Sequence, residues 1–135
     1  MKKILTVGVF DYFHLGHLRF FEKAKTYGDF LIVAVQDSKF VLKYKPGANL
    51  LYDTDQRIDL VKALRVVDEV ITYRSVDEII TVVDFDVFVI GEDQNHTGFQ
   101  NAVKWCNENS KEVIRLKRTP GISSSSIKEI LTILK

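Results

Sequence analysis

The sequence predicts an α/β fold with helices on both faces of a mainly parallel, five-stranded sheet. Short apolar stretches alternate along the 135 residues with amphipathic ones, and this alternation is typical of parallel strands joined by crossover helices. The stretch FLIVAV at residues 30–35 is apolar at every position, as strands covered on both faces by helices commonly are. Composition does not shift along the chain, so we expect one domain over residues 1–135.

Strands and helices are predicted from periodicity and from the residues that begin and end each segment. Strands are expected at residues 4–10, 30–35, 69–72, 87–90 and 112–116. Helices are expected at residues 18–25, 53–64, 75–83, 99–109 and from 126 onward. Together these elements predict a three-layer, Rossmann-like α/β/α domain.

Capping signals support several of these helix boundaries. The Ser-x-x-Glu spacing of a capping box occurs at residues 75–78 and again at 126–129. Either Asp53 or Thr54 can cap the helix that begins near it. Residues 43–53 contain proline, glycine and asparagine, which predicts a mobile loop.

The composition excludes several classes of protein. Hydrophobic residues make up 46% and charged residues 27% of the chain, as in ordinary globular proteins. With 19 basic and 18 acidic residues, the formal net charge is +1. This balance argues against a nucleic-acid partner or a membrane surface, because both attract clustered basic charge. The single cysteine excludes an internal disulfide and a multi-cysteine zinc site.

Targeting signals are not expected. The longest wholly apolar run, residues 30–35, is far too short to span a membrane. Polar residues interrupt the segment after Met1 too early for the apolar part of a secretion signal. We therefore expect a protein of the reducing cytoplasm.

Polar residues follow three of the predicted strands, at residues 11–17, 91–96 and 118–126. The carboxyl ends of parallel strands meet at one edge of a sheet, and ligands of open α/β sheets bind there. We therefore expect the three segments to form one site.

His14 and His17 lie three residues apart where a helix is predicted to start. This spacing puts both imidazoles on one face, and Gly16 between them lets a ligand approach the backbone. The free N–H groups and the positive end of the helix dipole suit phosphate. Two alternatives stay open. One is a metal site, although two histidines without a third ligand bind zinc poorly; the other is a pair of partly buried histidines that only cap the helix.

Residues 118–126 combine a basic side chain, a turn and hydroxyl groups. Arg118 offers a planar fork to phosphate oxygens, and Pro120 with Gly121 favours a turn. Four serines at 123–126 add donors at the start of the last predicted helix. This combination predicts an anion site. The alternative is an ordinary turn with an N-cap, although four serines exceed what capping requires.

Two motifs resemble known nucleotidyltransferase signatures. Residues 8–17 read GVFDYFHLGH, which resembles the HxGH signature of the nucleotidyltransferase α/β-phosphodiesterase superfamily. Residues 118–125 read RTPGISSS and resemble the more specific RTxGIST signature of the cytidylyltransferases. The motifs stand near the two ends of the chain, so the resemblance spans it. The group that the chain most resembles is the small single-domain glycerol-3-phosphate cytidylyltransferases.

The resemblance implies that the protein transfers CMP from CTP to a small phosphate monoester, such as glycerol 3-phosphate, and releases pyrophosphate. It implies catalytic roles for His14, His17, Arg118 and a loop lysine, either Lys43 or Lys45. The nucleotide-binding residues that it implies are Gly8, Val9, Phe10, Asp11, Gly16, Arg65, Gly91, Asp93, Thr119, Gly121, Ile122, Ser123, Ser124 and Ser125.

The same resemblance implies Mg²⁺ bridged by the triphosphate, without a direct side-chain ligand, and a homodimer. Asp11 is expected to orient a histidine or a Mg²⁺-bound water. Outside the motifs, His96 is expected to be a solvent-facing loop residue, and Trp105 and Cys106 are expected to be packing residues.

One segment departs from the glycerol-phosphate pattern. Those enzymes usually read GDDW after the fourth strand, whereas residues 91–94 here read GEDQ. The Gly-x-Asp-Gln pattern is also similar to archaeal FAD synthetases, which transfer adenylyl. Ethanolamine or choline phosphate as acceptor and adenylyl transfer therefore stay open as alternatives. A non-catalytic nucleotide sensor is a further alternative, against which the presence of both histidines, a loop lysine and Arg118 argues. A flavodoxin-like signalling domain is another, against which the two histidines and the absence of an acidic cluster argue.

Overall fold

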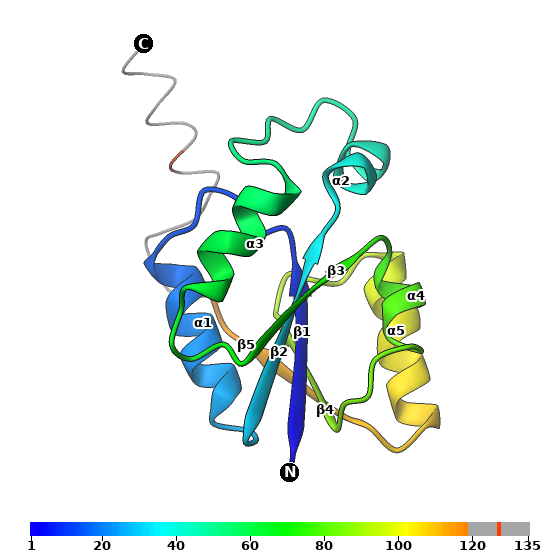
Figure 1. Ribbon diagram of the computed structural model, residues 1–135. Coiled ribbons are helices and arrows are strands. Elements are labelled where there is room, and N and C mark those ends of the chain that lie inside the picture. The colour runs from blue at the N-terminus through cyan, green and yellow to red at the C-terminus, as the bar shows by residue number, and fades with distance from the viewer. Residues whose placement is uncertain (119–126, 128–135) are drawn as a thin grey trace.

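The structure is a computed structural model that describes residues 1–118 and 127, and within them five parallel strands form one sheet (Figure 1). The strands are β1 (Lys3–Gly8), β2 (Phe30–Gln36), β3 (Glu69–Tyr73), β4 (Val87–Gly91) and β5 (Glu112–Leu116). They lie in the order β3-β2-β1-β4-β5, and every neighbouring pair is parallel. The predicted α/β class and parallel sheet are confirmed.

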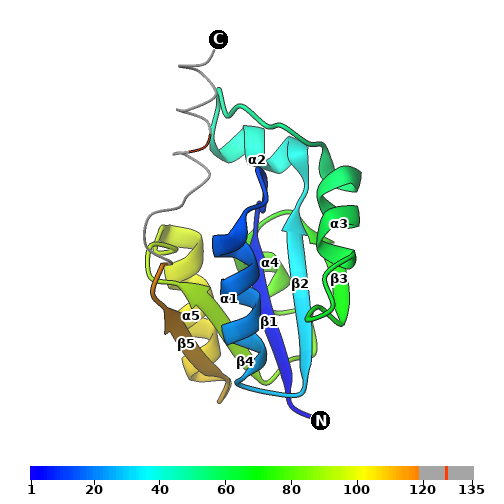
Figure 2. The same cartoon turned by 90° about the vertical axis from the view of Figure 1, so that its left-hand side faces the viewer.

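In the described part of the chain, five helices surround the sheet: α1 (Leu15–Lys25), α2 (Ser38–Tyr44), α3 (Thr54–Lys62), α4 (Val76–Ile79) and α5 (Thr97–Glu108). Helices α1 and α3 cover one face, and α4 and α5 cover the other (Figures 1 and 2). Helix α2 lies beyond the carboxyl end of β2. No helix among these is long and apolar enough to cross a membrane.

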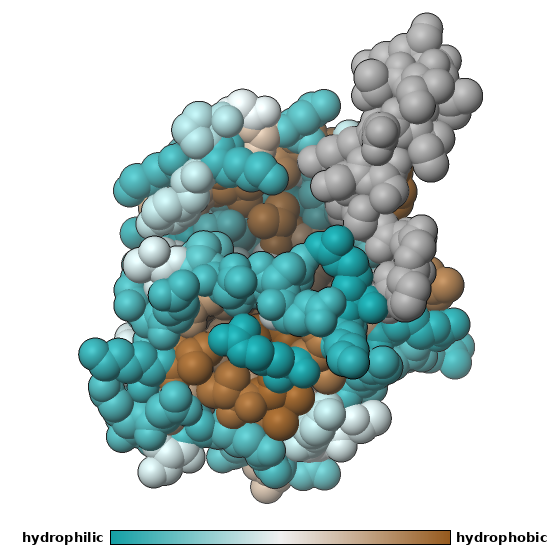
Figure 3. All heavy atoms as spheres, turned by 180° about the vertical axis from the view of Figure 1, so that it is seen from behind, coloured by the Kyte–Doolittle hydropathy of each residue, from teal (hydrophilic) through white to brown (hydrophobic). Residues whose placement is uncertain are grey.

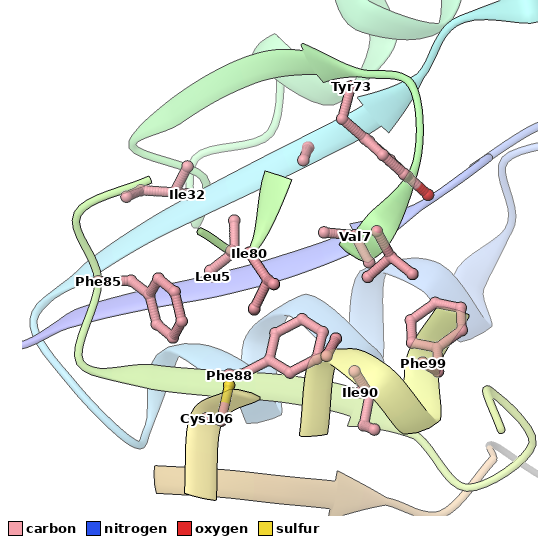
Figure 4. Close-up of a cluster of buried hydrophobic side chains, with 13 residues drawn as sticks. Leu5, Val7, Ile32, Tyr73, Ile80, Phe85, Phe88, Ile90, Phe99 and Cys106 are labelled. Atoms are coloured by element: carbon pink, nitrogen blue, oxygen red, sulfur yellow. The ribbon is translucent and has the colours of Figure 1, made fainter. Parts of the chain in front are cut away.

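The core consists of two apolar clusters, one on each side of the sheet. On one side, Phe88 of β4 packs with Phe99 and Cys106 of α5 (Figure 4). On the other side, Phe21 of α1 and Val61 of α3 belong to a second cluster. Successive residues of a strand point to opposite faces, so a strand covered on both sides has to be largely apolar, and the buried Thr6 of β1 is an exception. The FLIVAV stretch in β2 meets this requirement.

Two helices at the carboxyl edge of the sheet differ from the prediction. Helix α2 was not predicted, and only its last two residues, Lys43 and Tyr44, fall in the predicted mobile loop. The carboxylate of Asp37 caps it by accepting from the N–H of Lys39 at 2.9 Å. Helix α1 begins at Leu15, three residues earlier than predicted, because His14 acts as its N-cap.

The remaining helix boundaries were predicted with mixed success. Asp53 caps α3 as predicted, and its carboxylate accepts from the N–H of Gln56. Ser75 makes no side-chain capping bond, so the capping box predicted there is wrong, and α4 ends at Ile79 rather than near residue 83. The helix predicted from residue 126 lies outside the described residues.

Strand β1 lies at the centre of the sheet and pairs unequally with its two neighbours. It pairs with β2 at every position from Lys3 to Gly8. It pairs with β4 only at Ile4 and Leu5. The chain passes from β1 to β2 and β3 on one side and then returns to β4 on the other. The carboxyl ends of β1 and β4 therefore flank the topological switch point, where ligands of open α/β sheets bind.

Candidate functional site

His14 and His17 lie at the start of α1, where their rings stack with centroids 3.9 Å apart. Nδ1 of His14 accepts a hydrogen bond from the backbone N–H of Gly16 at 3.0 Å. Nδ1 of His17 accepts from the backbone N–H of His14 at 3.2 Å. Two histidines thus form the reciprocal capping box that is usually made by Ser or Thr with Glu or Gln. The two histidines therefore do cap the helix, and the second nitrogen of each ring is left for a ligand.

Both rings are held as neutral donors. A ring nitrogen that accepts a hydrogen bond carries no proton, so each neutral ring has its proton on Nε2. Burial and then the neighbouring His14 lower the pKa of His17 to about 4, against the opposing charge of Asp11. Burial and then the charge of Arg118 lower the pKa of His14 as well. At neutral pH the pair presents two uncharged Nε2–H donors.

The loop between β1 and α1, residues 9–14, has a strained backbone; we call it the histidine loop. Phe10 and Tyr12 have φ angles of 54° and 49°, in the left-handed region that other residues than glycine rarely adopt. The Phe10 ring lies against Gly8, where a Cβ would come within 2.8 Å of the ring, and edge-on to the His17 ring. Strained residues of this kind gather at functional sites.

Asp11 lies between the two strained residues, is 5% exposed, and ties the histidine loop to the segment before α3. Its Oδ2 accepts from the N–H of Leu51 at 2.6 Å, and its Oδ1 accepts from the N–H of Tyr52 at 3.1 Å. These bonds give Asp11 a structural role. It anchors two loops to each other, and it acts on His17 through its charge.

Arg57 of α3 is fully buried beneath the same loops, and it is not among the site residues expected from the sequence. Its guanidinium donates to the carbonyl oxygens of Val9 at 2.8 Å and Tyr52 at 3.2 Å, and to Oγ of Ser38 at 2.8 Å. Arg57 therefore joins the histidine loop to the starts of α2 and α3. Arg57 lies four residues before the buried Val61, and residues four apart share a helix face. This spacing was the signal in the sequence that Arg57 is buried.

Lys43 and Lys45 lie at the end of α2 and are both exposed. Nζ of Lys43 lies 5.5 Å from the centroid of the Phe40 ring and 5.7 Å from that of Tyr44. Lys45 is the C-cap of the helix and begins the connection to α3. Because α2 lies at the carboxyl end of the sheet (Figure 2), both lysines are on the expected side. That one of the two lysines has a catalytic role stays a prediction.

Arg118 and Asp93 bring the ends of β5 and β4 together. Their side chains form an ion pair, and the backbone N–H of Arg118 donates to Oε1 of Glu92 at 3.4 Å. The charge of Arg118 also reaches His14, whose pKa it lowers. The structure thus gathers the two histidines, Asp93 and Arg118 at the carboxyl ends of β1, β4 and β5.

The other predicted residues divide into three groups. Val9 and Gly16 contribute through their backbones, as described above, and Gly91 ends β4 next to the turn that holds Asp93. Arg65 lies elsewhere: it is in the turn before β3, at the amino-terminal edge of the sheet, and the structure does not bring it to the histidines. The residues that fall outside the described part of the chain are Thr119, Gly121, Ile122, Ser123, Ser124 and Ser125.

Three residues outside the motifs also have defined places. His96 is exposed, as predicted, and it caps α5 by accepting from the N–H of Gly98 at 3.1 Å. Cys106 is fully buried, and burial raises the pKa of its thiol to about 11. Trp105 packs against the same apolar cluster. The prediction that Trp105 and Cys106 are packing residues is confirmed.

Comparison with known proteins places the chain in one family and gives relatives with two different names. Residues 5–130 match the cytidylyltransferase-like family. The chain is 37% identical over 132 residues to the glycerol-3-phosphate cytidylyltransferase of Bacillus subtilis (strain 168), with 96% of each chain covered. It is 35% identical over 119 residues to the FAD synthase of Thermococcus sibiricus, which covers 84% of this chain and 79% of the relative.

A solved structure has the same fold. It is described as the lipopolysaccharide core biosynthesis protein from Thermoplasma volcanium GSS1, and it superposes on this chain with a TM-score of 0.72. The two are 26% identical, and the match covers 88% of this chain and 97% of the other.

Proposed function

This chain belongs to the cytidylyltransferase-like family, and from that premise we propose that it transfers CMP from CTP to a small phosphate monoester, glycerol 3-phosphate or a similar compound. Relatives named glycerol-3-phosphate cytidylyltransferase match nearly its whole length. The observation that carries the proposal is the neutral histidine pair. It presents two N–H donors at the positive end of α1, with Arg118 near enough to influence it.

In the proposed reaction, an oxygen of the acceptor phosphate attacks the α-phosphorus of CTP. A bond forms between these two atoms, and the bond from the α-phosphorus to the oxygen that bridges to the β-phosphate breaks. The electron pair of that bond leaves with pyrophosphate. The acceptor is already an anion, so no side chain has to remove a proton. The protein must hold two polyanions in line and stabilise the charge that builds on the α-phosphoryl oxygens and the leaving group.

The described residues supply donors for both tasks. His14 and His17 donate their Nε2–H groups to the α-phosphoryl oxygens, and their lowered pKa values keep the rings neutral at neutral pH. Arg118 binds the β- and γ-phosphates through its planar fork, and exchanges Asp93 for phosphate when it does so. A loop lysine, Lys43 or Lys45, adds a second cation to the triphosphate.

We propose that Mg²⁺ enters together with the triphosphate. Within residues 1–118 and 127, no three His, Cys, Asp or Glu side chains are grouped so that they could hold a metal ion. Mg²⁺ prefers oxygen ligands and keeps several waters, so phosphate oxygens and water supply its coordination. When bound, the ion neutralises charge on the leaving pyrophosphate.

Adenylyl transfer is the second candidate function. The sequence GEDQ at residues 91–94 favours it, as do relatives named FAD synthase that are 34–41% identical to this chain. In that reaction the donor would be ATP and the acceptor a flavin phosphate. The histidines and Arg118 would have the same roles, because the chemistry at the α-phosphorus is unchanged.

A substrate screen distinguishes the two functions. Each of the four nucleoside triphosphates is incubated with glycerol 3-phosphate, ethanolamine phosphate, choline phosphate or FMN, and pyrophosphate release is measured. We expect release with CTP and glycerol 3-phosphate or a similar monoester. Release only with ATP and FMN would establish the second candidate. No release with any pair, in the presence of Mg²⁺, would contradict both.

We further propose that the protein is a cytoplasmic homodimer. Figure 3 shows apolar side chains gathered on part of the rear surface, and pairing of two copies is one way to remove such an area from water. Light scattering after gel filtration should give a mass near twice the 15.5 kDa of one chain. A monomer at micromolar concentration would contradict the dimer.

A further inference from the structure

The sheet is open between the carboxyl ends of β1 and β4. Main-chain pairing between these strands stops at Leu5 and Phe88. On their other sides, β1 stays paired with β2 as far as Gly8, and β4 stays paired with β5 as far as Gly91. The last residues of β1 and β4 therefore do not serve as partners for each other, and this opening is the switch point of the fold.

The side chain of Gln94 lies across the opening. Its Oε1 accepts a hydrogen bond from the backbone N–H of Gly91 at 2.8 Å, and its Nε2 donates to the carbonyl oxygen of Val7 at 3.0 Å. A primary amide has the same donor and acceptor as a peptide group. The Gln94 amide thus replaces the missing backbone pairing between the end of β1 and the end of β4.

The bridge also fixes the turn that follows β4. The backbone N–H of Gln94 donates to the carbonyl of Gly91 at 3.1 Å, and the N–H of Glu92 donates to the carbonyl of Leu116 at 2.9 Å. The turn is therefore held from β1 on one side and from β5 on the other. Asp93 lies between these attachments and forms the ion pair with Arg118.

We propose that Gln94 is a positioning residue, which sets the separation of β1 and β4 at the switch point and holds the turn in which Asp93 meets Arg118. The inference rests on the proposed function, because Arg118 is the residue that binds the phosphates there. Without the bridge the turn is attached to β5 alone. Asp93 is then no longer held in place as the partner of Arg118 next to the histidines.

The test replaces Gln94 by methionine, which has a similar length and shape but neither a donor nor an acceptor of comparable strength. The matched control is Gln100→Met, because the Gln100 amide makes a local bond to the carbonyl of Asn95 at 2.8 Å on the exposed side of α5. Three quantities are measured on the full chain: hydrogen exchange of the Gly91 amide, calorimetric affinity for CTP and for ATP, and kcat and KM with the substrate pair that the wild type uses.

For Gln94→Met we expect the Gly91 amide to exchange at least about tenfold faster than in the control. Nucleotide affinity and kcat should each fall about tenfold, the scale of losing two ordinary hydrogen bonds, while KM for the acceptor changes little. A merely structural glutamine would accelerate exchange without changing kcat per folded molecule.

Two results would overturn the inference. One is equal Gly91 exchange in both variants, since the bridge would then not exist in solution. The other is faster exchange of the Gly91 amide with unchanged nucleotide affinity and kcat, since the bridge would then not position Asp93 and Arg118. Failure of the proposed function is visible separately, as a wild-type chain that binds neither CTP nor ATP.

Discussion

His17 makes the stability of the protein depend on pH. In the folded chain its pKa is lowered from 6.5 to about 4, so between these values the unfolded chain takes up a proton that the folded chain does not. The proton therefore stabilises the unfolded state as the pH falls from 6.5 toward 4. Stability that is fully present above pH 6.5 is lost across this window. The difference between the two pKa values corresponds to at most about 3 kcal/mol.

The substitution His17→Asn isolates this effect. Its amide oxygen can take the place of Nδ1 and accept from the N–H of His14, so the capping bond is kept while the titrating ring is removed. Urea unfolding is measured at several values between about pH 7 and pH 4. The free energy of unfolding of the wild type should fall more steeply than that of the variant, by up to about 3 kcal/mol over the window.

The control for loss of an imidazole is His96→Asn, since the His96 ring also accepts from a backbone N–H at the start of a helix but is exposed. This control should follow the wild type. Equal pH dependence of the wild type and His17→Asn would refute the reasoning, because it would mean that the folded chain does not hold His17 in its neutral form.

Four further substitutions test the catalytic site. His14→Asn keeps an acceptor for the helix cap but has no group at the place of Nε2, so kcat should fall about 10²-fold or more at nearly unchanged stability. The control His96→Asn should leave kcat unchanged. A near-wild-type kcat for His14→Asn would mean that His14 is not a catalytic residue. Arg118→Lys keeps the charge and loses the planar fork, so calorimetry should show weaker CTP binding, and equal affinity would be the contrary result. Lys43→Ala and Lys45→Ala should differ sharply in kcat/KM for CTP, whereas small and equal effects would mean that neither lysine contacts the triphosphate.

The strands were predictable because buried strands appear in the sequence as apolar stretches. A strand covered on both faces has to be largely apolar, and residues 30–35 show this without any polar interruption. Helix α2 was not predictable in the same way. It spans Ser38–Tyr44, two turns with a mixture of charged and apolar residues, and its clearest signal was Asp37 as a cap.

The site was predictable where a motif and the topology agreed. His14, His17, Asp93 and Arg118 meet because parallel strands bring their carboxyl ends to one edge. The misplacement of Arg65 follows from the same topology. A crossover helix runs back along the sheet, so the turn after α3 lies at the opposite edge.

Partners that are distant in the sequence could not be predicted. A buried arginine in α3 and a glutamine where the glycerol-phosphate enzymes usually have tryptophan are both visible in the sequence, at positions 57 and 94. Their hydrogen-bond partners include backbone groups of β1 and the histidine loop. Every residue has such groups, so sequence pattern does not indicate which of them a side chain will meet.

The histidine loop is held by residues that come 40 to 48 positions later in the chain. During synthesis the ribosome has made both histidines long before it makes Arg57, and loop closure over such a distance has an entropic cost. The left-handed conformations of Phe10 and Tyr12 add to that cost. We therefore expect the histidine loop of the nascent chain to reach its folded conformation only after residues 51–57 have left the ribosome and packed against it. If the chain is cleaved between α1 and residue 51, the histidine loop should regain its folded conformation only when the two fragments reassociate.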